Sequence, residues 1–332
     1  MVQNIMNRAF LALAGRSLGA LLVMAFVSSA SLAQPTTVRV GHFPNITHVQ
    51  ALVAHHLSRQ GKGWFEERLG PDVKIEWFIY NAGPSAMEAI FAATIDLTYV
   101  GPSPAINAYA KARGEEIRIV AGAANGGAAL VVQPDLPLNA PADFRGRKVG
   151  TPQLGNTQDV SARAWLVAGG VRVTLTGGDA HVIPTANPDQ LSLFKQKKLD
   201  AVWTVEPWVS RLETEAGGKT LIEESDAVTT VLVSSVKFLS GRRDIVSRFV
   251  AAHAELTEWI RKNPEEAQKI VRAELGAEMR ADVSPDLIAR AWKRIELAAD
   301  VSREALDKFV AKARTVGFLR TAPDLERLVE KP

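Results

Sequence analysis

The sequence contains no cysteine among its 332 residues. This absence excludes disulfide bonds, a thiolate nucleophile and cysteine-ligated metal sites. It also excludes a lipid anchor attached to a cysteine after an export signal. The remaining options are a protein held together by its hydrophobic core and a site built from other side chains and from the backbone.

Long apolar runs are missing as well, because no stretch reaches the roughly 20 residues that span a bilayer. The start of the chain has Arg8 and Arg16, a short apolar run over residues 18–27, and small residues at Ser31 and Ala33. This pattern predicts a signal peptide over residues 1–33, cleaved before Gln34. We therefore expect an exported protein that is free in the periplasm and has no stable membrane insertion after cleavage.

The sequence also has no large excess of positive or negative residues. The chain has 39 basic and 36 acidic residues, and cleavage of the signal peptide removes two arginines, so the formal charge falls from +3 to +1. Binding to a phosphate backbone needs a clustered basic surface. Nucleic acid is therefore not an expected partner.

Short β-rich runs alternate with segments of helical period, which predicts α/β architecture with mainly parallel sheets covered on both faces. The expected strands are residues 38–43, 73–80, 97–100, 117–122, 130–133, 148–152, 182–185, 201–205 and 229–235. The expected helices are residues 48–60, 85–93, 105–113, 157–168, 188–197 and 207–216, followed by amphipathic helices from Arg242 with stops at Asn263-Pro264, Ser284-Pro285 and Gly317.

This pattern indicates two α/β lobes that the chain crosses twice, near residues 130–133 and 229–235, with a cleft between them. The expected division is a signal peptide over 1–33, lobe I over 34–130, lobe II over 131–232, and the rest of lobe I over 233–332. In open α/β sheets a ligand binds beyond the carboxyl ends of the strands.

Three turns at such strand ends open directly into helices. They are Asn81-Ala82-Gly83-Pro84-Ser85, Gly101-Pro102-Ser103-Pro104 and Gly155-Asn156-Thr157. A helix N-terminus carries free N–H groups and about half a positive charge, so it holds an anion without a full counter-charge. Ser85, Ser103 and Thr157 are each helix caps or ligand donors, and Thr151 ends a further strand.

Two other groups of residues leave alternatives open. Trp203 either covers an apolar part of a ligand or packs in the core. Glu206 would repel an anion, and it either accepts a bond from a ligand or pairs with a base. In the first turn, Asn45 or Thr47 can cap the following helix, and either can reach the cleft. Phe43 and Trp203 would dominate the contacts with a neutral or aromatic ligand.

Histidines His42, His48, His55 and His56 suggest a metal, but no acidic residue lies between His42 and His56. Residues 48–56 would also spread over more than two helical turns. We expect no metal and no cofactor.

Catalytic signatures are absent beyond residue 33. There is no Gly-x-Ser-x-Gly, no His-Glu-x-x-His, no Walker loop and no dinucleotide fingerprint. The sequence therefore favours a binding protein over an enzyme.

Several motifs in order resemble the periplasmic substrate-binding proteins of ABC importers for nitrate, taurine and aliphatic sulfonates. The resemblance runs from about Val38 to about Gly317 and rests on Gly41-His42-Phe43-Pro44, Ala82-Gly83-Pro84-Ser85, Gly101-Pro102-Ser103-Pro104, Asp143-Phe144-Arg145-Gly146-Arg147-Lys148, Gly155-Asn156-Thr157, and Asp200-Ala201-Val202-Trp203 before Glu206-Pro207. It implies a type II periplasmic binding protein-like fold, with a hinge of two crossing strands and an interlobe cleft.

The resemblance also implies a function. The protein would be a monomer that captures a small anionic solute, an aliphatic or aryl sulfonate in the first place, and delivers it to an ABC permease and its ATPase. The alternative ligands are nitrate, taurine, or a neutral aromatic or vitamin-precursor compound. The alternative function is an enzyme on the same fold. The implied ligand-binding residues are Phe43, Asn45, Thr47, Ser85, Gly101, Pro102, Ser103, Thr151, Gly155, Asn156, Thr157, Trp203 and Glu206.

Overall fold

The structure is a computed structural model, and it describes residues 35–332. The predicted signal peptide and its cleavage site lie outside these residues. Within residues 35–332, none of the helices combines the length and apolar composition that a bilayer crossing requires.

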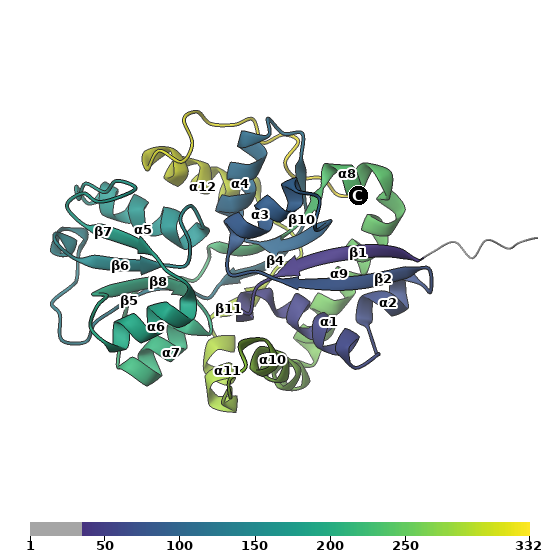
Figure 1. Ribbon diagram of the computed structural model, residues 1–332, viewed down its shortest axis with the longest axis horizontal. Coiled ribbons are helices and arrows are strands. Elements are labelled where there is room, and N and C mark those ends of the chain that lie inside the picture. The colour runs from purple at the N-terminus through teal and green to yellow at the C-terminus, as the bar shows by residue number, and fades with distance from the viewer. Residues whose placement is uncertain (1–34) are drawn as a thin grey trace, which may run out of the picture. The chain divides into compact units, whose positions relative to one another are not determined.

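Two mixed β-sheets form the framework (Figure 1). The six-stranded sheet has the order β11-β4-β10-β3-β1-β2, and the five-stranded sheet has the order β7-β6-β8-β5-β9. The first contains β1 Thr36–His42, β2 Val73–Ile79, β3 Leu97–Val100, β4 Ile117–Gly126, β10 Val228–Ser235 and β11 Ile295–Leu297. The second contains β5 Ala128–Val132, β6 Lys148–Thr151, β7 His181–Pro184, β8 Ala201–Val205 and β9 Lys219–Glu224. We call the six-stranded sheet and its helices lobe I, and the five-stranded sheet and its helices lobe II.

Helices connect the strands of both lobes. Those of lobe I are α1 Val49–Arg59, α2 Trp64–Leu69, α3 Gly83–Phe91, α4 Pro102–Lys111, α8 Val236–Gly241, α9 Arg243–Lys262, α10 Pro264–Met279, α11 Pro285–Trp292 and α12 Arg303–Thr315. Those of lobe II are α5 Thr157–Ala168, α6 Asn187–Lys195 and α7 Trp208–Ala216. Two short 3-10 turns, η1 Ile46–His48 and η2 Pro141–Phe144, precede α1 and β6.

The chain changes sheets at Gly126-Gly127 and again over residues 225–227. Gly126 and Gly127 both have φ near +70°. A Cβ on Gly126 would lie 2.4 Å from the Arg294 carbonyl oxygen and 2.8 Å from that of Ser225. Glycine is therefore required where the two crossings meet the C-terminal segment.

The elements follow the sequence pattern closely, with instructive differences. β3, β8 and α5 have the expected bounds, whereas the sequence pattern does not predict β9 and β11. The sheet changes lie a few residues before the expected junctions, so β5 belongs wholly to the second sheet and β10 to the first. The sheets are also less parallel than expected, because the crossing strands β5 and β10 run antiparallel to their neighbours.

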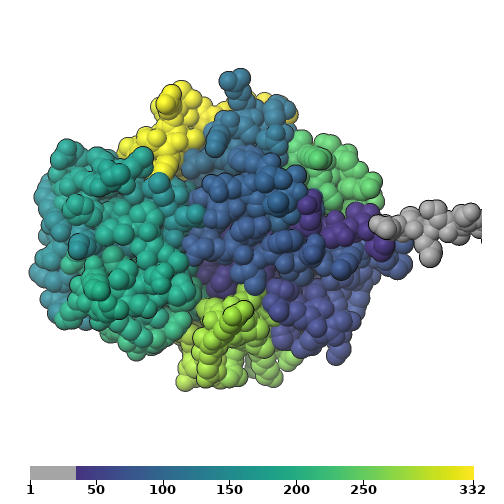
Figure 2. All heavy atoms as spheres, viewed as in Figure 1, coloured from purple at the N-terminus to yellow at the C-terminus, as the bar shows by residue number. Residues whose placement is uncertain are grey.

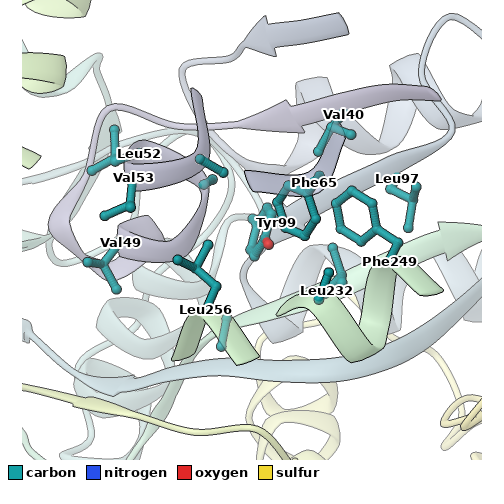
Figure 3. Close-up of a cluster of buried hydrophobic side chains, with 14 of the residues drawn as sticks. Val40, Val49, Leu52, Val53, Phe65, Leu97, Tyr99, Leu232, Phe249 and Leu256 are labelled. Carbon is teal, nitrogen blue, oxygen red and sulfur yellow. The ribbon is translucent and has the colours of Figure 1, made fainter. Parts of the chain in front are cut away.

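A large apolar core holds the outer helices of lobe I against its sheet (Figure 3). Phe65 of α2 and Phe249 of α9 stack with ring centroids 3.9 Å apart and planes 7° from parallel, and both are fully buried. Val40, Leu97 and Leu232 belong to the same cluster. This stack joins two helices that are distant in sequence.

Replacing Phe249 with alanine should therefore lower the free energy of unfolding by about 3–5 kcal/mol, through lost burial and the cavity left behind. Urea denaturation measures the change. Leu175→Ala, at a side chain that is 58% exposed, is the control and should change stability by less than about 0.5 kcal/mol. Equal stability of the two variants would show that the stack contributes nothing.

Candidate functional site

A pocket lies between the two lobes at the carboxyl ends of their parallel strands. Lobe I lines it with Phe43, Asn45, Thr47, His48, Asn81, Ala82, Gly83, Gly101, Pro104 and Thr229, and lobe II with Pro152, Asn156, Thr157, Gln158 and Val205. About 360 Å³ is free of protein atoms, including space open to solvent, but only about 20 Å³ admits the centre of a water-sized molecule. That is roughly room for one water, so the lobes are closed on each other. On the face drawn in Figure 2, the teal atoms of lobe II meet the blue atoms of lobe I.

Three helices begin at this pocket, two from lobe I and one from lobe II. The cap residues of α3 and α4, Ala82 and Gly101, contribute no side-chain hydrogen bond to the first turn. Prolines remove some of the free amides, which leaves those of Gly83, Ser85 and Ser103 as donors. In α5 the Asn156 side chain accepts only from the Asp159 amide, so the amides of Thr157 and Gln158 stay free of side-chain caps.

Two hydroxyls in these first turns have no partner within the described part of the chain. Ser103 Oγ and Thr157 Oγ1 are both buried and make no hydrogen bond. A buried hydroxyl without a partner costs about 1–3 kcal/mol. A Cβ on Gly101 would lie 2.2 Å from Thr157 Oγ1. Gly101 thus allows the first turns of α4 and α5, which belong to different lobes, to approach each other closely.

The pocket carries no formal charge. Among the described residues that line it there is no lysine, arginine, aspartate or glutamate. Its titratable residue is His48, and complete burial, together with the charge of His42, lowers the pKa of His48 well below its ordinary value. Any negative charge in the pocket would therefore be held by amide and hydroxyl dipoles alone.

Charged groups behind the pocket hold the first turn of α5 in place. Asp159 accepts hydrogen bonds from Thr151 Oγ1 at 2.9 Å, from the Gly155 amide at 2.9 Å and from Arg163 Nε at 3.0 Å. Thr151, Asp159 and Arg163 are all buried. Gly155 has φ +78°, which favours glycine at this turn. Thr151 and Gly155 therefore position the α5 N-terminus and do not line the pocket.

Hydrogen bonds across the cleft connect the two lobes. The Asn81 side chain donates to the Pro152 carbonyl at 3.2 Å, and the Gln153 amide donates to Ser85 Oγ at 2.8 Å. The Trp208 indole donates to Asn45 Oδ1 at 3.1 Å. Ser85, expected to be a ligand donor, is occupied in this closed form by a contact between the lobes.

Glu206 is paired with a base and does not line the pocket. Its carboxylate accepts from Arg294 at 2.9 Å and from Ser210 Oγ at 2.9 Å. Burial raises the pKa of Glu206, although the hydrogen bonds from Arg294 and Ser210 oppose this shift. Arg294 also contacts Glu213 of α7, so the network connects lobe II to the segment before β11. Of the two sequence interpretations of Glu206, the structure shows the pairing with a base.

Trp203 lies in the core of lobe II and not in the pocket, which corrects its assignment as a cleft residue. Its side chain is buried, and its indole donates to Glu224 at 3.1 Å. Trp203 and Val205 lie on the same face of β8, because side chains alternate along a strand. Val205, at the carboxyl end of β8, lines the pocket, whereas Trp203 lies two residues further inside lobe II and packs against Trp165. Phe43 is the aromatic ring that lines the pocket, 4.4 Å from the His48 ring.

Six of the predicted site residues thus line one pocket, namely Phe43, Asn45, Thr47, Gly101, Asn156 and Thr157. Seven do not line it in the closed form, namely Ser85, Pro102, Ser103, Thr151, Gly155, Trp203 and Glu206. The residues that sequence reasoning missed include Gln158 and Thr229. Gln158 follows a predicted residue in the α5 first turn, whereas no local pattern marks Thr229 on β10.

The two lobes, the double crossing and the interlobe pocket define a periplasmic binding protein-like fold of mixed α/β class. The chain belongs to the NMT1-like family, whose sequence model matches residues 31–275.

Known proteins with this fold include anion-binding proteins. The alkanesulfonate-binding protein SsuA of Xanthomonas axonopodis pv. citri, bound to MOPS, superimposes with a TM-score of 0.70 at 19% identity, covering 90% of this chain and 97% of that one. The nitrate-binding protein NrtA of Synechocystis PCC 6803 gives 0.68 at 15% identity, covering 87% and 84%. At these identities the likeness establishes the fold.

A relative of Escherichia coli strain K12, named "Putative aliphatic sulfonates-binding protein", is 26% identical over 213 residues. The match covers 63% of this chain and 62% of that relative, which is less than two thirds of its length.

Asp159→Asn should destabilise the protein by about 3–5 kcal/mol, because it leaves the buried Arg163 guanidinium without its counter-charge. Denaturant unfolding with a lobe II probe such as Trp165 or Trp203 fluorescence measures this. Asp300→Asn, which removes an exposed pair with Lys331, is the matched control and should cost less than about 1 kcal/mol. A loss no larger than the control's would mean that Asp159 does not anchor the α5 first turn.

Proposed function

We propose that this protein is the solute-binding component of an ABC importer, and that it captures a small oxyanion, first of all an aliphatic or aryl sulfonate, between its lobes. The observation that carries the proposal is the unpartnered hydroxyl of Thr157, which lines the pocket in a helix first turn that approaches Gly101 of lobe I across the cleft. A buried hydroxyl without a partner destabilises the closed protein unless a ligand accepts a hydrogen bond from it.

The pocket suits an oxyanion because it offers backbone amides and a hydroxyl that are free to donate. The free first-turn amides of Gly83, Thr157 and Gln158 and the hydroxyl of Thr157 can each donate to an anionic oxygen. Closure removes water, and the lower local dielectric strengthens these bonds. No full counter-charge is needed, so the ligand can leave when the lobes open.

An organic substituent would contact the apolar part of the lining, which Phe43, Pro104, Pro152 and Val205 supply. The space in the closed form is small, so a larger sulfonate requires the lobes to separate slightly. The names of the sulfonate-binding and nitrate-binding relatives support an anionic ligand for this chain. Nitrate and taurine are the alternatives within the same class.

The proposed partners are a membrane permease and its ATPase, to which the closed protein delivers its ligand. The protein would act as a monomer in the periplasm, after cleavage near Ala33 and Gln34, and would catalyse no reaction. Formation of a product from a bound sulfonate would instead indicate an enzyme on the same fold.

A neutral aromatic ligand is the second candidate, and a specific observation favours it. The lining has no formal positive charge, and the Phe43 and His48 rings lie together in it. An apolar ring could stack there without an anion.

Ligand charge separates these candidates in a thermal-unfolding screen. Methanesulfonate, longer alkanesulfonates, benzenesulfonate, taurine and nitrate are compared with methanesulfonamide and benzenesulfonamide, which have similar shapes but no charge. A sulfonate at a hundred times its dissociation constant should stabilise the protein by about 2.7 kcal/mol, measured as a raised melting temperature. The matched sulfonamide should give no shift. Stabilisation by the sulfonamides alone would favour the neutral ligand.

Thr157→Val tests the role of the hydroxyl. Valine keeps the shape and removes the unpartnered oxygen, so the ligand-free protein should be as stable as wild type or more so. Sulfonate binding should weaken by about 1.5–3 kcal/mol, the contribution of a hydrogen bond to a charged group, as measured by calorimetry. Thr230→Val is the matched control, because Thr230 Oγ1 is also buried and unpartnered but does not line the pocket. If both variants bind equally well, Thr157 is not a ligand donor.

A further inference from the structure

A second polar cluster lies beside β1, outside the residues that line the pocket. It contains His42 at the end of β1, His55 of α1 and Glu278 of α10. His42 Nε2 lies 3.1 Å from Glu278 Oε1, His55 Nδ1 lies 3.0 Å from the same oxygen, and the two nitrogens are 3.1 Å apart. The three atoms therefore form a nearly equilateral triangle in a buried place.

With both imidazoles neutral, the state that binds a metal, hydrogen bonds alone do not satisfy this triangle. The other nitrogen of His42, Nδ1, is 3.3 Å from the Phe43 carbonyl, which can only accept. A proton on Nδ1 leaves Nε2 of the neutral ring with a lone pair directed at His55 and Glu278. A proton on His55 Nδ1 can be donated to Glu278 or to His42, but no proton then lies between His42 Nε2 and Glu278 Oε1, where two lone pairs meet at 3.1 Å.

A cation satisfies all three lone pairs at once. Four ligands placed tetrahedrally at the 2.0–2.1 Å typical of zinc with nitrogen and oxygen would be about 3.3–3.4 Å apart, and the observed separations are only slightly shorter. The contact of His42 Nδ1 with a backbone carbonyl is the outer-shell bond that metal-ligating histidines usually make. In addition, Glu278 Oε2 is buried and has no hydrogen-bond partner in the described structure.

We propose that His42, His55 and Glu278 bind a divalent transition-metal ion of the zinc class. Two imidazoles and a carboxylate match the ligand preferences of zinc, and less well those of magnesium or calcium, which favour oxygen. A fourth position is filled by water or by Glu274, whose Oε1 lies 3.1 Å from His55 Nδ1. The His55 side chain is 10% exposed, whereas those of His42 and Glu278 are fully buried, so the ion enters past His55.

The place of the cluster gives the ion a structural role. It joins β1 and α1 to α10, with 223 residues between His55 and Glu278. The Trp77 ring stacks on His55 at 5.4 Å and meets His42 edge-on at 5.6 Å, which fixes both rings. A bound ion would therefore hold the C-terminal helices of lobe I to the strand end that leads into the pocket.

Metal titration of the mature, tag-free protein, first treated with a chelator, tests the proposal. Zinc binding is measured by calorimetry, and cobalt(II) is used as a spectroscopic substitute. One equivalent of zinc should bind, the melting temperature should rise, and cobalt should give the visible absorption of a four-coordinate site. Magnesium should produce none of these effects.

Variants locate the ion. His55→Gln and Glu278→Gln should each weaken zinc binding at least about tenfold, the loss that even an outer-shell change can cause. His181→Gln, at an exposed histidine of β7, should leave the affinity unchanged. If a variant does not fold, X-ray absorption at the zinc edge of the wild-type complex must show two imidazole ligands. Failure of the wild type to bind at micromolar zinc, affinity unaffected by both substitutions, or fewer than two imidazoles would overturn the proposal. None of these results depends on which solute the pocket binds.

Discussion

The close approach of Gly101 and Thr157 is the contact on which the geometry of the pocket depends. A side chain at residue 101 would occupy the position of Thr157 Oγ1, so the first turns of α4 and α5 could not face each other in the closed form. Gly101 has φ −69°, which any residue can adopt. Its glycine is therefore explained by the space between the lobes and not by its own backbone conformation.

The protein keeps its full charges away from the pocket while placing them where they orient its dipoles. Asp159 and Arg163 fix the α5 first turn from behind, and Glu206 with Arg294 joins lobe II to the C-terminal segment. A buried ion pair adds little net stability compared with an apolar pair, but it fixes geometry because breaking it is costly. The lining can then present uncharged donors in fixed directions.

The sequence predicted most of the fold because its signals are local. Strand and helix periods, the prolines at helix starts and the glycine turns specify β3, β8 and α5 residue by residue. Side-chain direction at the site was harder to predict. Trp203 and Val205 lie on the same face of β8, and only the packing of lobe II shows that Val205, at the carboxyl end of the strand, reaches the pocket. The acidic partner of His42 and His55 lies on α10, more than 200 residues away, so histidine spacing alone argued against a metal.

The proposed cation and the proposed anion would not be independent, because the end of β1 serves both sites. His42 points into the cluster, and Phe43, the next residue, lines the pocket. His48, also in the lining, is close enough for its protonation to be affected by the charges of both His42 and Glu278. A divalent ion in the cluster would replace the net negative charge of Glu278 with a positive one. By Coulomb's law that change favours an anion in a water-excluded pocket and gives no comparable advantage to a neutral ring.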